Sequence, residues 1–197
     1  MSSREEILNA IRRNAPSQLA SPAIPAGTLY EDPASQFEKV FTGVGGRVVH
    51  VRGRDLLAQE IAKLDVVAVA NQCASRVDEI PSRGIDLQST SDPHGLANLD
   101  VAILPAEFGV AENGAVWIPG GMLGPHRAIF VIAQHLVLVL EASQIVSNMH
   151  QAYARVRVEH PGFGLFLSGP SKTADIEQSL VIGAHGARSC TLMLITT

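Results

Sequence analysis

The sequence predicts an α/β fold, in which an open, mostly parallel sheet carries helices on both faces. Three observations predict it. Strand-like and helix-like segments alternate along the chain, several strand-like runs are apolar throughout, and 197 residues suit one domain with a small appendage. Runs without a polar face are typical of parallel strands buried on both sides, and the alternation is typical of layered α/β domains.

The N-terminal segment is expected to form an arm outside this domain. Ser3 and Glu6 have the spacing of a capping box, and an apolar stripe follows, which predicts a short amphipathic helix ending before Pro16. The next residues include three prolines and a glycine, which predicts a linker. We therefore divide the chain into an arm with its linker, residues 1–28, and an α/β domain, residues 29–197.

Helix and strand patterns alternate through the first half of the domain. Asp32-Pro33 marks the start of a helix and Gly45-Gly46 marks its end, and later segments switch between helical spacing and continuous apolar runs. The elements expected here are a helix at 33–44, a strand at 47–51, a helix at 53–64, a strand at 66–70 and a short strand at 85–87.

The second half continues this alternation around a glycine-rich loop. Residues 120–125 are expected to connect two strands of a hairpin, at 115–118 and 129–132. The other elements expected here are strands at 101–104, 135–140, 164–167 and 191–195, a helix capped by Ser143 and running to about 157, and a helix from about 173.

The composition excludes several classes of protein. A hydrophobic content of 46% is too high for a disordered chain, and a net charge of −4 gives no reason to expect nucleic-acid binding. The longest apolar run, 128–140, is shorter than the roughly 20 residues of a membrane span, and the N-terminus has no apolar signal core. We therefore expect a cytoplasmic protein. Two cysteines, Cys73 and Cys190, exclude a disulfide scaffold and a zinc or iron–sulfur site with four thiolate ligands.

Charged residues are scarce in one part of the chain. They make up 17% of the sequence, against roughly 25% in an average domain, and the deficit falls on residues 101–152. This segment contains only four charges: Glu107, Glu112, Arg127 and Glu141. Such a segment is expected to be largely buried, in the core or against a partner.

The first candidate for a functional site lies within this segment, at residues 109–114. Glu112 is expected in an apolar setting, where a carboxylate is suited to act as a nucleophile or base. Asn113 and Gly114 can form a turn whose backbone N–H stabilises an oxyanion, and Gly109 completes the motif. An ordinary hairpin turn with a structural acid explains the same residues, and both interpretations stay open.

The second candidate follows the strand at 164–167 and precedes the predicted helix. A glycine, hydroxyl groups and a helix N-terminus together favour a bound anion, although a well-capped helix has the same pattern. The spacing around Lys172 is not that of a Walker A loop, and the chain has no Gly-x-Gly-x-x-Gly motif. The residues of this candidate are Ser168, Gly169, Pro170, Ser171, Thr173, Asp175 and Glu177.

The third candidate is His185 with Gly186, because a histidine between small residues is open to a ligand. By contrast, His135 lies in an apolar run and is expected to be a hydrogen-bonded core histidine. The remaining histidines have no metal-ligand spacing, and His-Glu-x-x-His is absent, so we expect no metal site.

Together these motifs resemble a known family. Ser168 to Glu177, followed by Gly183-x-His185-Gly186, resembles the signature of the lactate utilization protein C family, and residues 109–114 resemble its other motif. The resemblance covers nearly the whole chain. Two positions depart from the family pattern: the threonine or serine usual near Asn113 is absent, and Ala187 stands where the family has proline.

The resemblance implies a fold and a role. It implies that residues 29–197 form a LUD-type α/β domain, related to the sugar-phosphate isomerases and coenzyme A transferases. It further implies a role in the oxidation of L-lactate to pyruvate, beside cysteine-rich and iron–sulfur proteins of the same operon. Iron–sulfur clusters would then lie on a partner protein, and this chain would bind no cofactor of its own.

The same resemblance suggests a role for one residue. Glu112-Asn113-Gly114 is similar to the segment that carries the nucleophilic glutamate of coenzyme A transferases. We therefore expect Glu112 as the catalytic residue at the carboxyl ends of the strands, facing the loop at 168–173. The ligand would be a small carboxylate or a phosphorylated molecule.

Two other classes of function stay open at this point. The protein could be a stand-alone acyl-CoA transferase or sugar-phosphate isomerase. It could also be a non-catalytic assembly protein, whose arm and apolar surface bind the iron–sulfur partner. The sequence leaves the oligomeric state open as well.

Overall fold

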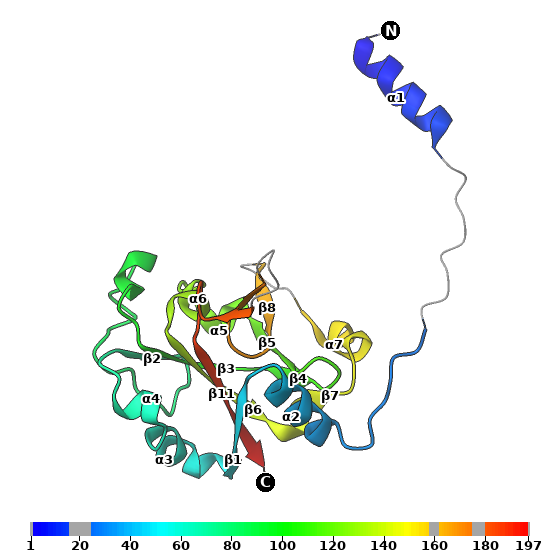
Figure 1. Ribbon diagram of the computed structural model, residues 1–197. Coiled ribbons are helices and arrows are strands. Elements are labelled where there is room, and N and C mark those ends of the chain that lie inside the picture. The colour runs from blue at the N-terminus through cyan, green and yellow to red at the C-terminus, as the bar shows by residue number, and fades with distance from the viewer. Residues whose placement is uncertain (1, 16–24, 158–161, 175–179, 197) are drawn as a thin grey trace.

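A computed structural model describes residues 2–15, 25–157, 162–174 and 180–196 (Figure 1). Its centre is a five-stranded sheet in which every pair of neighbouring strands is parallel. The strands, in spatial order, are β1 (Arg47–Arg52), β11 (Ser189–Thr196), β6 (His135–Glu141), β3 (Val101–Pro105) and β2 (Cys73–Ser75). The predicted α/β fold with a mostly parallel sheet is therefore confirmed.

The central strand β6 explains why the sequence showed an apolar run instead of an alternating pattern. Successive side chains of a strand point to opposite faces. Leu136, Leu138 and Leu140 join the core on one face, whereas Val137 and Val139 join the core on the other. Both faces are buried between Leu136 and Leu140, so every position of this part of the strand has to be apolar.

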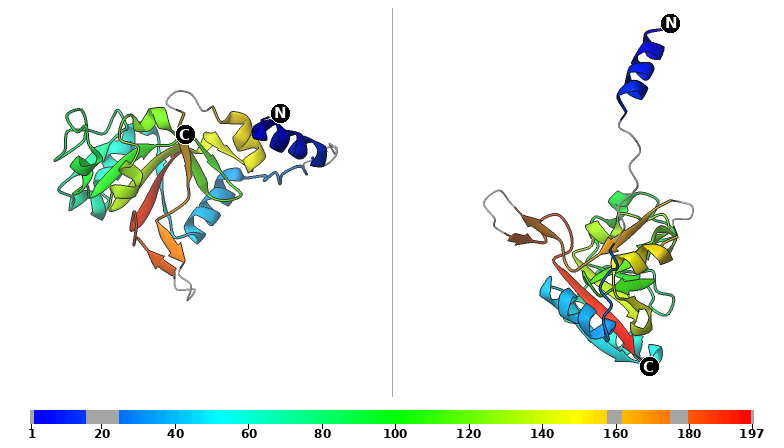
Figure 2. Two further views of the ribbon diagram at one scale, coloured as in Figure 1. Left: turned by 90° about the horizontal axis from the view of Figure 1, so that it is seen from above. Right: turned by 90° about the vertical axis from the view of Figure 1, so that its right-hand side faces the viewer.

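Helices cover both faces of this sheet. One face packs against α3 (Leu57–Ala62) and α4 (Asp65–Ala68), which follow a 3-10 turn, η1 (Arg54–Leu56). The other face packs against α2 (Pro33–Gly43), whose Phe37 and Phe41 are fully buried. Figure 1 shows α3 and α4 on one side of the sheet and α2 on the other, and Figure 2 shows α2 beside β11.

A second sheet lies on the α2 side of the core. Its four strands, in spatial order, are β7 (Ile145–Val146), β4 (Phe108–Val110), β5 (Ala115–Pro119) and β8 (Gly164–Leu167). Its outer face carries Phe108, Trp117 and Phe166, which pack together beside α7 (Met149–Arg155). The smaller elements are α5 (Gly120–Leu123), α6 (Ile129–Ile132), η2 (Pro93–Leu96), η3 (Ala142–Gln144), β9 (Lys172–Ala174) and β10 (Leu180–Ile182).

Three short apolar segments differ from their prediction. The strand expected at 66–70 is the helix α4, and the strand of the main sheet comes a few residues later, as β2. The strand expected at 129–132 is the helix α6, so the glycine-rich loop does not connect a hairpin. Residues 85–87 form no strand, although Leu87 is buried. Runs of about four apolar residues fit a helix and a strand equally well, and tertiary packing decides between them.

Two predicted helices also differ. The helix expected from Ser143 begins at Met149, with Asn148 as its N-cap, because residues 142–146 first form η3 and β7. The helix expected from about Thr173 is absent at its start, where the chain forms β9, antiparallel to β10. The residues between these two strands lie outside the described part of the chain.

The predicted N-terminal helix is present as α1 (Ser3–Asn14), and its N-cap lies one residue earlier than predicted. Its capping box is formed by Ser2 and Glu5 rather than by Ser3 and Glu6. No residue of α1 is buried, and Ile7 and Ile11 remain exposed. Most of the predicted linker lies outside the described residues, so the domain boundary at residue 28 stays a prediction. Among the described residues, no helix has the length and apolar character needed to cross a membrane.

Candidate functional site

The motif at residues 109–114 forms the tight turn between β4 and β5. Val110 pairs with Ala115, the Gly114 N–H donates to the Val110 carbonyl at 2.9 Å, and the Ala115 N–H donates to Asn113 Oδ1 at 3.0 Å. The Glu112 N–H donates to the Ser147 carbonyl at 3.0 Å. The N–H groups of Glu112 and Gly114 are therefore already used, and neither is available to an oxyanion.

The charge-poor segment is largely buried, as predicted, but its four charged residues are not. Glu107, Glu112 and Arg127 are exposed, and Glu141 is half-buried. The expectation that Glu112 lies in an apolar setting is therefore wrong. Glu112 lies on the exposed side of the turn between β4 and β5.

Gly114 places this turn against helix α2. Its φ is +63°, and a Cβ atom there would lie 2.8 Å from the backbone nitrogen of Phe41. Only glycine tolerates both the left-handed conformation and this approach. The turn with Glu112 and Asn113 therefore sits close to the C-terminal half of α2.

The second motif packs on the first. The Ser168 hydroxyl, just after β8, donates to the Asn113 carbonyl at 3.0 Å. Gly169 has a φ of +70°, and a Cβ atom there would lie 3.0 Å from the Val44 carbonyl oxygen. The structure thus brings together two motifs that are 55 residues apart, as we predicted from the sequence.

The third motif joins the second. The Ser171 N–H donates to the Ala187 carbonyl at 2.9 Å, and the Gly183 N–H donates to the Ser171 carbonyl at 2.9 Å. A Cβ atom on Gly186 would lie 3.0 Å from Ser171 Cβ, so these backbones are in contact. His185 is exposed beside them. We call residues 112–113, 168–171 and 183–186 the motif patch. Glu112, Asn113, Ala184 and His185 are exposed there, whereas Gly169 and Pro170 are buried.

Part of the motif patch lies at the amino ends of the parallel strands. The Arg188 N–H donates to the Gln134 carbonyl, just before β11 and β6 begin, and Pro170 lies beside Gly45, just before β1. We expected these loops at the carboxyl ends, and that expectation is wrong. Ser168 does follow a strand, but β8 belongs to the second sheet.

The remaining candidate residues of the second motif are Thr173, Asp175 and Glu177. Thr173 lies in β9, where its hydroxyl donates to the Val181 carbonyl at 3.4 Å, so no helix N-terminus is available here for an anion. Asp175 and Glu177 lie outside the described residues.

His135 is hydrogen-bonded within the main sheet, as predicted, but it is half-buried rather than part of the core. Its Nδ1 lies 2.8 Å from the Ser189 hydroxyl on the neighbouring strand. Burial lowers the pKa of this imidazole, and the nearby Arg188 guanidinium lowers it further, against the opposing effect of Asp100. The neutral form is therefore favoured. Within the described ranges, no group of three or more His, Cys, Asp or Glu side chains could hold a metal ion.

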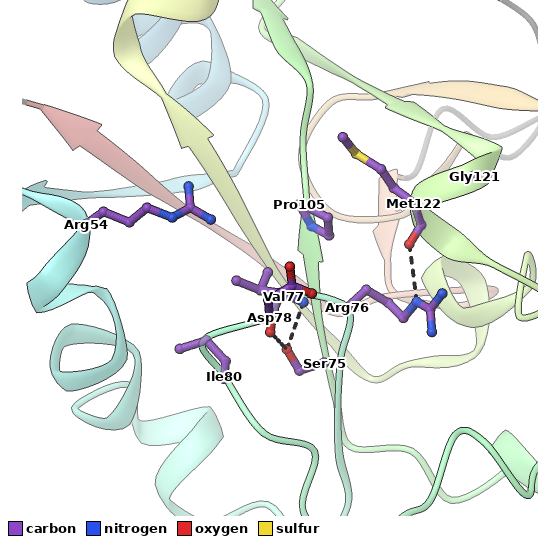
Figure 3. Close-up of a pocket in the computed structure, with 9 residues that line it drawn as sticks. All are labelled: Arg54, Ser75, Arg76, Val77, Asp78, Ile80, Pro105, Gly121 and Met122. Carbon is purple, nitrogen blue, oxygen red and sulfur yellow. Dashed lines mark hydrogen bonds between the residues drawn. The ribbon is translucent and has the colours of Figure 1, made fainter.

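The carboxyl ends of the main strands form a separate cavity of about 580 Å³, which the sequence analysis missed. Figure 3 shows Arg54 on one side of it and Arg76, with Met122, on the other. Its lining comes from the residues after β1, the end of β2 and the segment after it, the end of β3, and α5: Arg54, Ser75, Arg76, Val77, Asp78, Ile80, Pro105, Gly121 and Met122. Carboxyl ends of parallel strands are the usual place for a ligand.

The two arginines of this cavity have different partners. Arg54 pairs with Glu79 through Nε and with Glu141 through Nη1, at 3.0 Å for the second pair. The hydrogen bonds that Arg54 donates to Glu79 are the main cause that raises the pKa of Arg54, and they lower the pKa of Glu79. Arg76 instead donates its Nε to the Met122 carbonyl at 3.2 Å. Among the described residues, no carboxylate lies within 4 Å of Arg76.

Comparison with known proteins gives the family. The family model described as the LUD domain matches residues 79–195, more than half of the chain. The protein belongs to the LUD domain family. The matched segment includes the whole motif patch. The cavity residues Arg54 and 75–78 precede this segment.

Several relatives of this LUD protein share a name. The present chain is 30% identical over 131 residues to lactate utilization protein C from Geobacillus sp. (strain WCH70). The match covers 60% of this chain and 54% of the Geobacillus protein. The present chain is 26% identical to the protein of the same name from Exiguobacterium sp., covering 72% and 71% of the two chains. The chain spans about half the length of the first curated relatives it matches.

A solved structure shares the fold. It is the crystal structure of a DUF162 family protein from Deinococcus radiodurans, with a TM-score of 0.59 and 17% identity. The match covers 83% of this chain and 96% of that one. At this identity the likeness shows the arrangement of the elements alone.

Proposed function

We propose that this protein is a subunit of an L-lactate utilization system, which oxidises L-lactate to pyruvate together with iron–sulfur proteins. The observation that carries the proposal is the LUD domain match together with relatives named lactate utilization protein C. In this proposal the chain itself binds a small anionic ligand and carries no redox cofactor.

The positions of the two cysteines support the proposal that this chain carries no iron–sulfur cluster. Cys73 and Cys190 are both buried and belong to the cores on opposite faces of the main sheet. Thiolate ligands of one iron–sulfur cluster must converge on one point. We therefore assign the clusters of the system to partner proteins, which are expected among the products of neighbouring genes.

The motif patch is the proposed contact site for this role. It joins three sequence motifs through the Ser168–Asn113 hydrogen bond and the backbone hydrogen bonds of Ser171. Glu112 and His185 are exposed there. They can contact a ligand, or a partner protein that delivers the ligand, without a change in fold. Of these residues, Glu112 is the one that we propose to take part in turnover.

The test combines a gene deletion with one charge-removing variant. We expect the deletion strain to lose growth on L-lactate and to keep growth on glucose, and the intact gene to restore it. Glu112→Gln should fail to restore growth, because it removes the negative charge while keeping the size of the side chain. Glu107→Gln, a change of another exposed carboxylate on the same segment, is the control and should restore it.

Two results would contradict the proposal at different levels. Normal growth of the deletion strain on L-lactate would remove the function itself. Normal growth with Glu112→Gln would leave the function but remove the role of Glu112. Co-purification of cysteine-rich and iron–sulfur proteins with the tagged chain from lactate-grown cells tests the proposed partners.

A further inference from the structure

Arg76 is held in place at the carboxyl edge of the main sheet. Its N–H donates to the Ile103 carbonyl at 2.9 Å, which continues the pairing of β2 with β3. Its side chain is anchored through Nε to the Met122 carbonyl, and its guanidinium lies against the backbone of Gly124. A Cβ atom on Gly124 would come within 3.1 Å of Arg76 Cζ, so the guanidinium lies in close contact with this glycine. The backbone of Arg76 is therefore held by β3, and its side chain is held by α5 and the C-cap of that helix.

Arg76 lines the cavity, and its terminal nitrogens lie next to Gly124. Its one side-chain hydrogen bond within the described residues uses Nε, which leaves Nη1 and Nη2 for another acceptor. Arg76 is half-buried and lines the cavity of about 580 Å³. Two parallel N–H groups of a guanidinium match the two oxygens of a carboxylate. The volume falls in the usual range of small-molecule sites, roughly 300–1,000 Å³.

The charges around the cavity limit the ligand to a low charge. Arg54 is already compensated by Glu79 and Glu141. Asp78 lines the same cavity and opposes an anion. This leaves Arg76 as the cation without a carboxylate partner among the described residues that line the cavity, which suits one negative charge better than the two of a phosphate at neutral pH.

The rest of the lining favours a carbon chain next to the charged group. Val77, Ile80, Pro105 and Met122 contribute apolar side chains to the wall. We propose that this cavity is a binding site for a small monocarboxylic acid, whose carboxylate pairs with Arg76. The site lies at the opposite strand ends from the Ser171–Ala187 contact of the motif patch, and it rests on the proposed function only for the choice of L-lactate and pyruvate as probes.

Titration calorimetry on the full chain tests this site. L-lactate, pyruvate, inorganic phosphate and chloride are compared at equal ionic strength and pH 7. We expect at least one of the two carboxylates to bind, and phosphate and chloride not to bind. Arg76→Gln should weaken binding roughly 10- to 100-fold, as expected for loss of hydrogen bonds to a charged group. Arg188→Gln, which removes an exposed charge at the opposite edge of the sheet, is the matched control and should bind like the wild type.

Two further variants keep the test decisive if Arg76→Gln does not fold. Gly121→Leu adds a side chain at the cavity wall, where a Cβ atom meets nothing within 4 Å, and should block binding without removing a charge. Asp78→Asn removes the opposing carboxylate and should strengthen binding several-fold. Circular dichroism and the melting temperature without ligand identify variants that fold.

The outcomes separate this inference from the proposed function. Absence of binding by both carboxylates, wild-type binding by a folded Arg76→Gln, or binding of phosphate alone would each overturn the monocarboxylate site. Binding through Arg76 in a protein whose deletion does not affect growth on L-lactate would uphold the site and remove the proposed function. Growth on L-lactate that requires the gene but is unaffected by Arg76→Gln would uphold the proposed function and remove the role of this site in it.

Discussion

Single residues show how strongly the core of this protein protects its reactive groups. Cys190 is buried at the start of β11, and burial raises the pKa of its thiol to about 12. Burial also raises the pKa of Cys73. The thiolate is the reactive form, so neither cysteine is expected to react in the folded protein. A thiol reagent should therefore modify both cysteines in denaturant and neither of them in native buffer.

The same thiol predicts a dependence of stability on pH. An unfolded cysteine ionises near pH 9, whereas folded Cys190 keeps its proton up to about pH 12. Between these values the folded state binds more protons, so stability falls as pH rises, by at most about 1.4 kcal/mol per pH unit from this group. Urea unfolding at pH 8 and pH 10 should show the loss, and Cys190→Ala should lack this component. An equal loss in both proteins would contradict the assignment.

Gly114 allows the turn at residues 111–114 to pack closely against helix α2. Gly114→Ala combines a left-handed backbone with a Cβ atom against the Phe41 backbone. We expect a loss of about 2 kcal/mol or more in unfolding free energy, measured by urea denaturation. Gly121→Ala is the matched control, because its Cβ meets no atom within 4 Å and its φ is not positive. Similar stability of both variants would show that the approach to α2 imposes no constraint.

Among the elements, β6 has the clearest structural role. It lies at the centre of the main sheet between β11 and β3, and both of its faces are covered. Leu138→Ala removes a fully buried side chain and should cost about 2–5 kcal/mol of stability. Val131→Ala on α6, where the side chain is half exposed, should stay within about 0.5 kcal/mol. Thermal unfolding of both variants checks this difference.

Element types were predictable where a pattern was long or had a clear end. Asp32 caps α2 and Gly45 follows its end with a φ of +87°, as the sequence indicated. The strands β3, β6, β8 and β11 also match the prediction to within about two residues at each end. By contrast, α4 and α6 have only four residues each, and no periodicity can be read from one turn of helix.

At the scale of the whole molecule, α1 contributes little to the stability of the α/β domain. No residue of this helix is buried, so removing it exposes no core. A chain lacking residues 1–15 should keep its melting temperature within about 2 °C, as expected for a change of at most about 0.5 kcal/mol. A clearly lower melting temperature would show that α1 packs on the domain in solution, and an unchanged one leaves it free for a partner.

The sequence by itself determined the class of fold and the residues of the motifs. Apolar runs such as 135–140 favour strands buried on both faces, and glycines with hydroxyl and acidic residues mark loops, because both are local properties of the chain. The family resemblance, rather than these local patterns, placed Glu112–Gly114 opposite the loop at 168–173, and the Ser168–Asn113 hydrogen bond agrees with that placement.

Only the tertiary structure decided which edge of the sheet each loop occupies. The exposure of Glu112, the second sheet and the placement of Ser171 beside Ala187 all depend on pairings between distant strands. The cavity around Arg76 is of the same kind, because its walls come from four separate elements and segments. A sequence shows which side chains are present, but the free energy of burying them together selects their neighbours.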